Sequence, residues 1–383
     1  MKIGFVLDDR LDKPDGVQQY VKLVGAWLSS RGHDVHYLVG HSPAATEKNV
    51  HHLSRTVGVR FNRNRMAIPL PARKKAVAAL LAHEHFDVLH VQMPYSPLLA
   101  GRVVAAADSH TAVVGTFHIL PHGLLSSTGT RLLGSFLRRN KRRFDAFLSV
   151  SPAAQSFAKT HFGIASEVLS NVVELQRYSA GVPYKKLADK ANIVFLGRLV
   201  ERKGAGHLLV AYDRLVTNHP ELAATTRLII CGDGQLRAKL EAQAELLRSK
   251  HKTDIVFTGF LQEDEKPRYL ASAQIAVFPA TGGESFGIVL IEAMAAGAQV
   301  VVGGDNPGYA SVLGSIPDAL VPPTKPDQFA ARLYSILSEP QRAATMHALQ
   351  QSLVQHYDIA HVGPQLEAFY ERALAKREQK RDT

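Results

Sequence analysis

The sequence predicts an α/β protein built from two doubly wound parallel-sheet domains of similar size. Short apolar runs typical of buried strands alternate with amphipathic helical patterns along the 383 residues. An apolar fraction of 46% at this length favours two hydrophobic cores over one. Between 174 and 190 the apolar period gives way to glycine, proline and lysine, and then resumes. We therefore expect domains over 1–178 and 191–358, with a linker near 174–190.

The expected strands of the two domains are separated by helical patterns. In the first domain they are 2–7, 33–39, 87–91, 112–117, 146–150 and 167–169. The helix that follows the first strand begins at Gly16, with apolar residues on one face. In the second domain the strands are 193–196, 228–231, 255–257, 275–278 and 299–302. Ligands of such sheets bind beyond the carboxyl ends of the strands, so two facing domains would form a cleft.

Composition limits the compartment and the class of protein. A single cysteine, Cys231, excludes internal disulfides and suits a reducing environment, where it is expected to be a packed strand thiol. The N-terminal MKIGFVLDD is expected to be a first strand and not a signal peptide, and no apolar run reaches about 18 residues. We expect a cytoplasmic protein.

Positive charge is concentrated in the first half of the chain. Lys and Arg exceed Asp and Glu by ten over residues 1–180 and by one over residues 181–383, for a net charge of +11. The first domain is therefore expected to face an anionic partner.

The stretch TGGESFGIVLIEAMAAG, residues 281–297, carries the densest chemical signal. Its two glycines allow close approach of the backbone to a ligand, and the apolar run predicts a buried helix starting near Ser285 and Phe286. Free amides at a helix start attract a phosphate. Glu284 would lie just before the helix and Glu292 two turns into it, placed for a sugar and for a pair of ribose hydroxyls.

Basic and small residues follow other predicted strands. Arg198 and Lys203 lie in the loop after the first strand of the second domain, where a guanidinium fork and an ammonium suit a diphosphate. An exposed basic loop is the alternative. Gly16 occupies the equivalent loop of the first domain, or is a plain helix-start glycine. His118 ends the strand 112–117, where a buried structural histidine is the alternative, and His122 is a weaker candidate.

The sequence gives little support for a metal site or a dinucleotide site. The histidines show no HExxH spacing, no Asp-x-Asp pair follows a strand, and Cys231 stands alone. CGDGQ at 231–235 lacks the full dinucleotide fingerprint. We expect no metal and no cofactor.

Two basic clusters remain in the first domain: Arg63, Arg65, Arg73, Lys74 and Lys75, and Arg138, Arg139, Lys141, Arg142 and Arg143. The first precedes and opens an amphipathic helix that runs to about His85. Both could be solvated helix faces, surfaces for anionic lipid or, third, nucleic-acid sites. Few aromatic residues are interleaved with them, which disfavours single-stranded nucleic acid.

Four motifs in order resemble glycosyltransferase family 4, whose members are retaining enzymes with the two-domain GT-B fold. They are GGESFGIVLIEAMAAG with its E-x7-E pair, GRLVERKG at 197–204, Gly16 in DGVQQY and His118 in GTFH. The similarity covers essentially the whole chain. Within the family, GVQ at 16–18, FDVLHV at 86–91 and the basic helix near 73 are most similar to bacterial phosphatidylinositol mannosyltransferases.

The resemblance implies a role for each matched residue. Glu292 would hold the donor ribose, Arg198 and Lys203 the diphosphate, and Glu284 with the amides of Phe286 and Gly287 the transferred sugar and its phosphate. Gly16 would approach the diphosphate and His118 the sugar or acceptor. Leu261 and Lys266 fall where those mannosyltransferases hold the base, which favours GDP. The last helix, about 359–383, would return to the first domain.

Two departures from the family bear on the acceptor. Asp15-Gly16 stands where the family often has Gly-Gly, and Ser170-Asn171-Val172-Val173-Glu174 replaces the usual Pro-Asn-Gly-Val-Asp. Neither touches the donor residues.

We therefore expect a metal-independent retaining glycosyltransferase that moves mannose from GDP-mannose to a phospholipid or glycolipid acceptor such as phosphatidylinositol. It would sit on the inner face of the membrane through Arg63, Arg65, Arg73, Lys74 and Lys75. One alternative is a transferase that uses a UDP-sugar and a soluble acceptor such as an inositol phosphate. The other is a non-catalytic binder of anions or nucleic acid.

Overall fold

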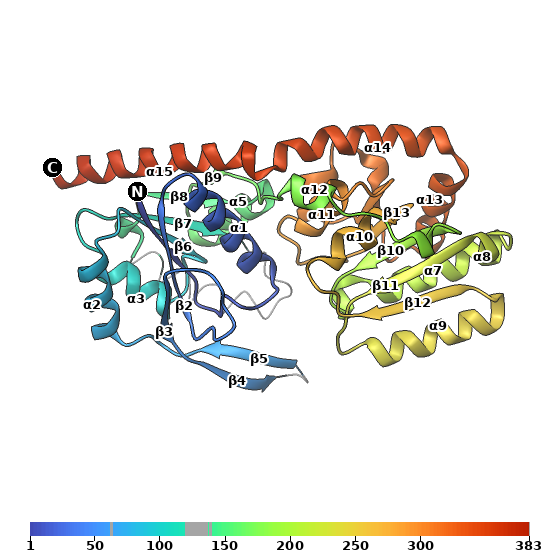
Figure 1. Ribbon diagram of the computed structural model, residues 1–383, viewed down its shortest axis with the longest axis horizontal. Helices are drawn as coiled ribbons and strands as arrows, with labels where there is room; N and C mark the ends of the chain where they lie inside the picture. Colours follow the sequence, from blue (N-terminus) through green and yellow to red (C-terminus); the bar gives the residue numbers. More distant parts are fainter. Residues whose placement is uncertain (62–63, 119–136, 138–139, 383) are drawn as a thin grey trace. The chain divides into compact units, whose positions relative to one another are not determined.

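In the computed structural model (Figure 1), which describes residues 1–61, 64–118, 137 and 140–382, the chain forms two compact units. Unit 1 comprises Met1–Val172 and Ile359–Thr383, and unit 2 comprises Val173–Asp358. The segment expected as a linker, 174–190, therefore belongs by its contacts to unit 2. Each unit contains a parallel sheet with helices, which confirms the predicted α/β fold with two Rossmann-like sheets.

Unit 1 is organised around a parallel sheet in the order β3-β2-β1-β6-β7-β8-β9. Its strands are β1 Lys2–Val6, β2 Asp34–Gly40, β3 Val50–Ser54, β6 Val88–Gln92, β7 Ala112–Phe117, β8 Ala146–Ser149 and β9 Glu167–Val168. Its helices are α1 Gly16–Ser30, α2 Lys74–Glu84, α3 Leu99–Ala106, α5 Pro152–Phe157 and α15 Ile359–Asp382. The order reverses between β1 and β6, the switch point at which doubly wound sheets bind ligands.

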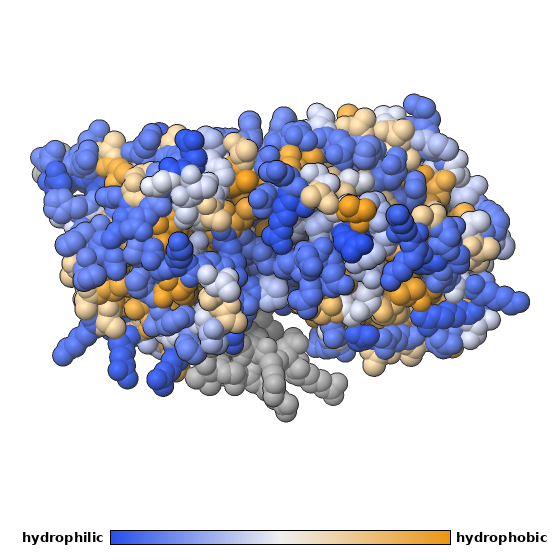
Figure 2. Space-filling view, viewed as in Figure 1, coloured by the Kyte–Doolittle hydropathy of each residue, from blue (hydrophilic) through white to orange (hydrophobic). Residues whose placement is uncertain are grey.

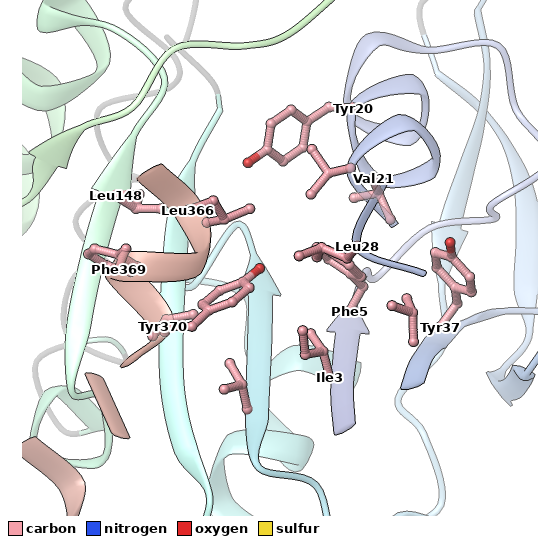
Figure 3. Packing of buried hydrophobic residues seen from close by; sticks show 14 of the residues in the cluster. Ile3, Phe5, Tyr20, Val21, Leu28, Tyr37, Leu148, Leu366, Phe369 and Tyr370 are labelled. Atoms are coloured by element: carbon pink, nitrogen blue, oxygen red, sulfur yellow. The ribbon is translucent and has the colours of Figure 1, made fainter. Parts of the chain in front are cut away.

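Alternating strand residues divide the core of unit 1 into two layers. Ile3 and Phe5 of β1 pack with α1 and α15 on one face, and Val6 packs with α2, α3 and α5 on the other. Figure 3 shows Leu366 and Tyr370 of α15 projecting toward the β1 and α1 residues, and Phe369 on the side of Leu148 of β8. The last helix thus completes one of the two cores of unit 1.

An antiparallel hairpin, β4 Thr56–Phe61 and β5 Asn64–Pro69, is inserted between β3 and α2. The sequence did not predict it, nor β3. β3 and β4 contain no continuous apolar run of the kind used to recognise strands, and in β5 the run 66–68 is short and ends at Pro69.

Unit 2 repeats the topology, with strand order β12-β11-β10-β13-β14-β15 and a switch point between β10 and β13. The strands are β10 Ala191–Leu196, β11 Thr226–Cys231, β12 Asp254–Gly259, β13 Ile275–Phe278, β14 Val301–Gly304 and β15 Leu320–Val321. The helices are α6 Leu175–Ser179, α7 Ala205–Asn218, α8 Leu222–Thr225, α9 Arg237–His251, α10 Glu265–Ala271, α11 Ile288–Ala295, α12 Pro307–Leu313, α13 Pro326–Ser338 and α14 Pro340–Val354. Cys231 is buried in β11, as expected for a packed thiol.

Candidate functional site

The candidate residues of unit 2 lie beyond the carboxyl ends of its strands, two of which, β10 and β13, flank the switch point. Arg198 follows β10, Leu261 follows β12, and Glu284 lies between β13 and α11. Arg198 is exposed and Leu261 is buried. Because parallel strands all end at the same edge of the sheet, the topology brings these separate segments to one edge, the one where doubly wound sheets bind ligands.

Glu284 is held by two cations. Lys203 Nζ lies 2.9 Å from Oε1 of Glu284, and the Arg202 guanidinium donates to the same oxygen. Both cations belong to a 3-10 turn, Glu201–Lys203, directly before α7. The Glu284 side chain is 12% exposed, so this carboxylate and its partners form a largely buried charged group.

Charge keeps Glu284 ionised despite its burial. Burial alone would raise the pKa of the carboxyl, but the charges and hydrogen bonds of Lys203 and Arg202 outweigh it and leave the pKa below its ordinary value. Near neutral pH Glu284 is therefore a carboxylate that accepts hydrogen bonds, suited to sugar hydroxyls and unsuited to donating a proton.

Gly204 explains why this turn can lie so close to β13. It has φ +78°, and a Cβ there would lie 1.9 Å from the carbonyl oxygen of Pro279. The backbone of Thr281 then donates to the carbonyl of Arg202 at 2.9 Å. The GRLVERKG and GGES segments are therefore fastened together by backbone, which sets Lys203 beside Glu284.

Helix α11 begins at Ile288, two to three residues later than predicted. The reason is Gly287, which takes φ +109° and has no room for a side chain, since a Cβ would lie 2.6 Å from the ring of Tyr309. Phe286, expected to border the ligand through its amide, has a buried ring packed edge-on against Tyr357. The start of α11 is therefore set by the turn at Gly287 and not by the first residue of the apolar pattern.

Glu292 of α11 is paired with a residue that the sequence did not single out. The hydroxyl of Tyr178 in α6 donates to Oε1 of Glu292 at 2.6 Å. Burial raises the pKa of Glu292, while the Lys266 charge and the Tyr178 hydrogen bond oppose that rise. Lys266 of α10 in turn pairs with Glu263. This carboxylate is restrained on one oxygen by a neutral donor, which leaves it able to accept from further hydroxyls.

In unit 1, the first residue of α1 is Gly16, which is exposed beyond the carboxyl end of β1. His118 directly follows β7 and is buried, with Nε2 2.5 Å from Oε1 of Gln92 and its ring edge-on to Tyr20. An amide oxygen only accepts, so Nε2 carries the hydrogen and Nδ1 carries the lone pair. Burial lowers the pKa of His118 to about 3, which keeps the imidazole neutral.

The basic clusters are only partly within the described residues. Arg73, Lys74 and Lys75 are exposed where α2 begins, and Val77 and Leu81 of the same helix are buried. Arg65 lies in β5, and Arg63, Arg138, Arg139 and His122 lie outside the described residues. Lys141, Arg142 and Arg143 form an exposed 3-10 turn. Figure 2 shows apolar residues interspersed among hydrophilic ones over the face in view.

Sequence reasoning missed Arg202, Tyr178 and Gln92. Arg202 stands beside Lys203 in ERKG and could have been included with it. Tyr178 lies 114 positions from Glu292, and Gln92 lies 26 positions from His118. Only the fold brings each of these pairs together. In the part of the chain that the structure describes, no helix has the length and apolarity to cross a bilayer.

Two family models and several known proteins match the chain. Residues 14–177 match "Glycosyltransferase Family 4" and residues 183–351 match "Glycosyl transferases group 1". The chain is 31% identical to phosphatidyl-myo-inositol mannosyltransferase of Mycolicibacterium smegmatis, over 97% of this chain and 94% of that one. It is 26% identical to a GDP-mannose-dependent monoacylated alpha-(1-6)-phosphatidylinositol monomannoside mannosyltransferase of Corynebacterium glutamicum, over 76% and 77% of the two chains.

Among solved structures, sucrose-phosphate synthase of Thermosynechococcus elongatus matches with a TM-score of 0.74 and 18% identity. The match covers 98% of this chain and 99% of that one. At that identity the likeness bears on the fold alone.

Proposed function

We propose, from the premise that this chain belongs to glycosyltransferase family 4, that it transfers mannose from GDP-mannose to a phosphatidylinositol-type lipid. One observation carries the proposal: the 31% identity to a phosphatidyl-myo-inositol mannosyltransferase runs over nearly the full length of both proteins. The similarity thus includes unit 1, to which we assign the acceptor, as well as unit 2, to which we assign the donor. The Corynebacterium relative, GDP-mannose-dependent by name, supports the choice of donor.

In the proposed reaction unit 2 binds the nucleotide sugar. Glu292 accepts from the ribose hydroxyls, while Arg198 and Lys203 neutralise the diphosphate that leaves. Glu284 accepts from the sugar hydroxyls. Leu261 and Lys266 border the base, and the amides of Phe286 and Gly287 face the sugar phosphate. Binding of the diphosphate would draw Lys203 partly away from Glu284, so Arg202 becomes the cation that keeps Glu284 ionised.

Unit 1 binds the acceptor in this proposal. The transfer retains the anomeric configuration and needs no metal ion at the diphosphate: the mannosyl C1–O bond to the diphosphate breaks, and C1 bonds to an inositol oxygen. The departing phosphate oxygen receives the inositol hydroxyl proton. His118, neutral and hydrogen-bonded through Nε2, contacts the sugar or inositol. Gly16 approaches the diphosphate, and Arg73, Lys74 and Lys75, with Arg63 and Arg65, attract the anionic lipid surface.

The test is an assay of the purified chain with GDP-mannose and vesicles that contain phosphatidylinositol. Mannolipid formation with retained configuration, read by mass spectrometry and NMR, is the expected result. GDP-glucose, UDP-glucose and ADP-glucose serve as donor controls, and vesicles of neutral phospholipid as the acceptor control. A thermal-shift screen of the same nucleotide sugars reports donor binding without turnover, because a ligand of the folded state raises the Tm.

Two outcomes would replace the proposal. Transfer to a water-soluble inositol phosphate but not to phosphatidylinositol would move the acceptor to the soluble class. Stabilisation by UDP-sugars and not by GDP-mannose would overturn the donor.

A further inference from the structure

A group of polar side chains lies at the edge of the unit 1 sheet opposite to the one that carries Gly16 and His118. His36 is near the start of β2, His51 is near the start of β3, and Glu84 is the last residue of α2. These three offer ligand atoms that all lie within 4.8 Å of one another, the one such group found in the described residues. Their positions in the sequence are too far apart to form a recognisable metal motif.

The ligand atoms already have nearly the separation that a metal requires. Nδ1 of His36 lies 2.8 Å from Nε2 of His51 and 3.9 Å from Oε2 of Glu84. In a tetrahedral zinc site, bonds of about 2.0–2.1 Å place neighbouring ligand atoms about 3.3 Å apart. The observed distances lie on either side of that value, so the imidazole nitrogens need to part by about half an ångström.

A second carboxylate sets the direction of the His36 ring. Nε2 of His36 lies 3.1 Å from Oδ1 of Asp34, and Phe86 packs edge-on against the ring. Since a carboxylate accepts, Nε2 carries the hydrogen, and the lone pair of Nδ1 points to His51. A carboxylate behind a metal-binding imidazole fixes its tautomer in this same way. His51 donates a hydrogen to Nδ1 of His36, and a metal ion bound by the two rings would take the place of that hydrogen.

We propose that His36, His51 and Glu84 bind one zinc ion, with water as the fourth ligand. Two imidazoles and one carboxylate are donors that suit zinc. Asp34 and Glu84 carry two negative charges against the single charge of Lys2, which contacts both. The Lys2 ammonium, 2.9 Å from Oε2 of Glu84, is displaced when zinc binds. The ion joins β2, β3 and the end of α2, and this site is independent of the proposed transferase function.

The experiment titrates the chelator-treated, untagged full chain with zinc chloride by calorimetry, in a buffer that does not coordinate metals. Binding of one zinc ion per chain is expected, with a rise in Tm. Co²⁺ in place of zinc should give the visible absorption of a tetrahedral site. Absence of specific binding by the parent protein overturns the proposal.

Variants distinguish this site from adventitious binding. His51→Ala and Glu84→Gln are expected to lose the zinc-dependent rise in Tm, and Asp34→Asn to weaken affinity by about 10- to 100-fold. Lys2→Met should tighten binding, because it removes the cation that competes for Glu84. His161→Ala, an exposed histidine near the other end of the sheet order, is the control and should bind as the parent does.

Thermal unfolding of each variant without zinc shows that it is folded. Equal zinc affinity in the parent and in folded His51→Ala would overturn the assignment, as would weaker binding by Lys2→Met.

Discussion

The hydroxyl of Tyr178 lies 2.6 Å from Oε1 of Glu292 and donates a hydrogen bond to it. Tyr178 is buried in α6, near the start of unit 2, whereas Glu292 lies in α11. The contact restrains the carboxylate proposed to bind the donor ribose before any ligand arrives. Tyr178 is therefore a positioning residue, and its effect should appear in donor binding.

Tyr178→Phe is expected to raise the KM for the nucleotide sugar about tenfold while kcat changes little. A hydrogen bond to a charged group contributes about 1.5–3 kcal/mol. Part of that loss in donor binding is offset, because the Glu292 carboxylate stays restrained by its surroundings. Loss of the hydrogen bond also raises the pKa of Glu292 further, so the KM of the variant should begin to rise at a higher pH as the solution is acidified. Steady-state kinetics from pH 5 to 8 measure both effects. Tyr184→Phe, whose ring packs on Tyr269, is the control, and equal KM values in Tyr178→Phe and the parent would argue against the role.

Glu292→Gln should make the protein more stable and a poorer enzyme. The pKa of Glu292 is raised in the folded protein, so ionisation of this side chain opposes folding progressively as pH rises from its ordinary value through its raised one. Glutamine can still accept from Tyr178. We expect the free energy of unfolding of the variant to exceed that of the parent by an amount on the order of 1 kcal/mol at pH 8. This difference should vanish at acidic pH. Thermal unfolding at the two pH values measures it; a gain that is larger at acidic pH would contradict the prediction.

Arg202→Met should act on Glu284 and not on the diphosphate. Removal of this cation raises the pKa of Glu284 toward its ordinary value or above it, because burial is then less well opposed. Activity that depends on the carboxylate is lost as pH falls through that pKa, so the acid limb of the kcat/KM profile should move to higher pH. At pH 7 we expect kcat/KM to fall about tenfold to a hundredfold. Breaking a buried ion pair would usually cost more, but here Lys203 remains beside Glu284. Arg214→Met, on the exposed part of α7, should leave the profile unchanged.

Gln92→Leu should lower kcat about tenfold through His118. The change leaves the Nε2 hydrogen of His118 without its amide acceptor and so weakens the restraint on the ring. Gln92→Glu keeps an acceptor and should restore part of the rate, while donor KM stays constant in both variants. Loss of donor affinity in Gln92→Leu with unchanged kcat would show that the pair serves another purpose.

Lys74→Glu with Lys75→Glu should weaken binding to vesicles that contain anionic lipid. Each basic residue near such a surface contributes about 1 kcal/mol, so loss of two lowers the partition coefficient roughly 30-fold or more. Co-sedimentation at low and high salt measures this, with neutral vesicles for comparison. Lys141→Glu with Arg142→Glu changes the charge equally in the other exposed cluster and should leave binding largely intact. Equal loss in the two double variants would mean that net charge, and not the α2 surface, controls binding.

The fold was predictable because buried parallel strands appear as short apolar runs, and every run identified overlaps a strand of the two sheets. The strands that were not predicted, β3, the β4–β5 hairpin and the two-residue β15, contain no long apolar run. At the site, the glycines and glutamates of 281–292 form a pattern that can be recognised in the sequence itself. The partners of Glu292 and His118 cannot be recognised in this way, because Tyr178 and Gln92 are ordinary core residues until the topology places them.

Unit 2 is an insertion within the chain of unit 1, and this affects how the protein is made. Ile359, Leu366, Phe369 and Tyr370 fill one face of the first sheet, yet they are synthesised after all of unit 2. Unit 2 is a single continuous segment, so it can fold first during translation. The face of the first sheet that α15 covers remains exposed until α15 has been synthesised. The emerging chain therefore exposes an apolar sheet face for the time needed to synthesise about 190 residues, at about 5–20 residues per second. Over that interval a chaperone would find its binding surface on unit 1.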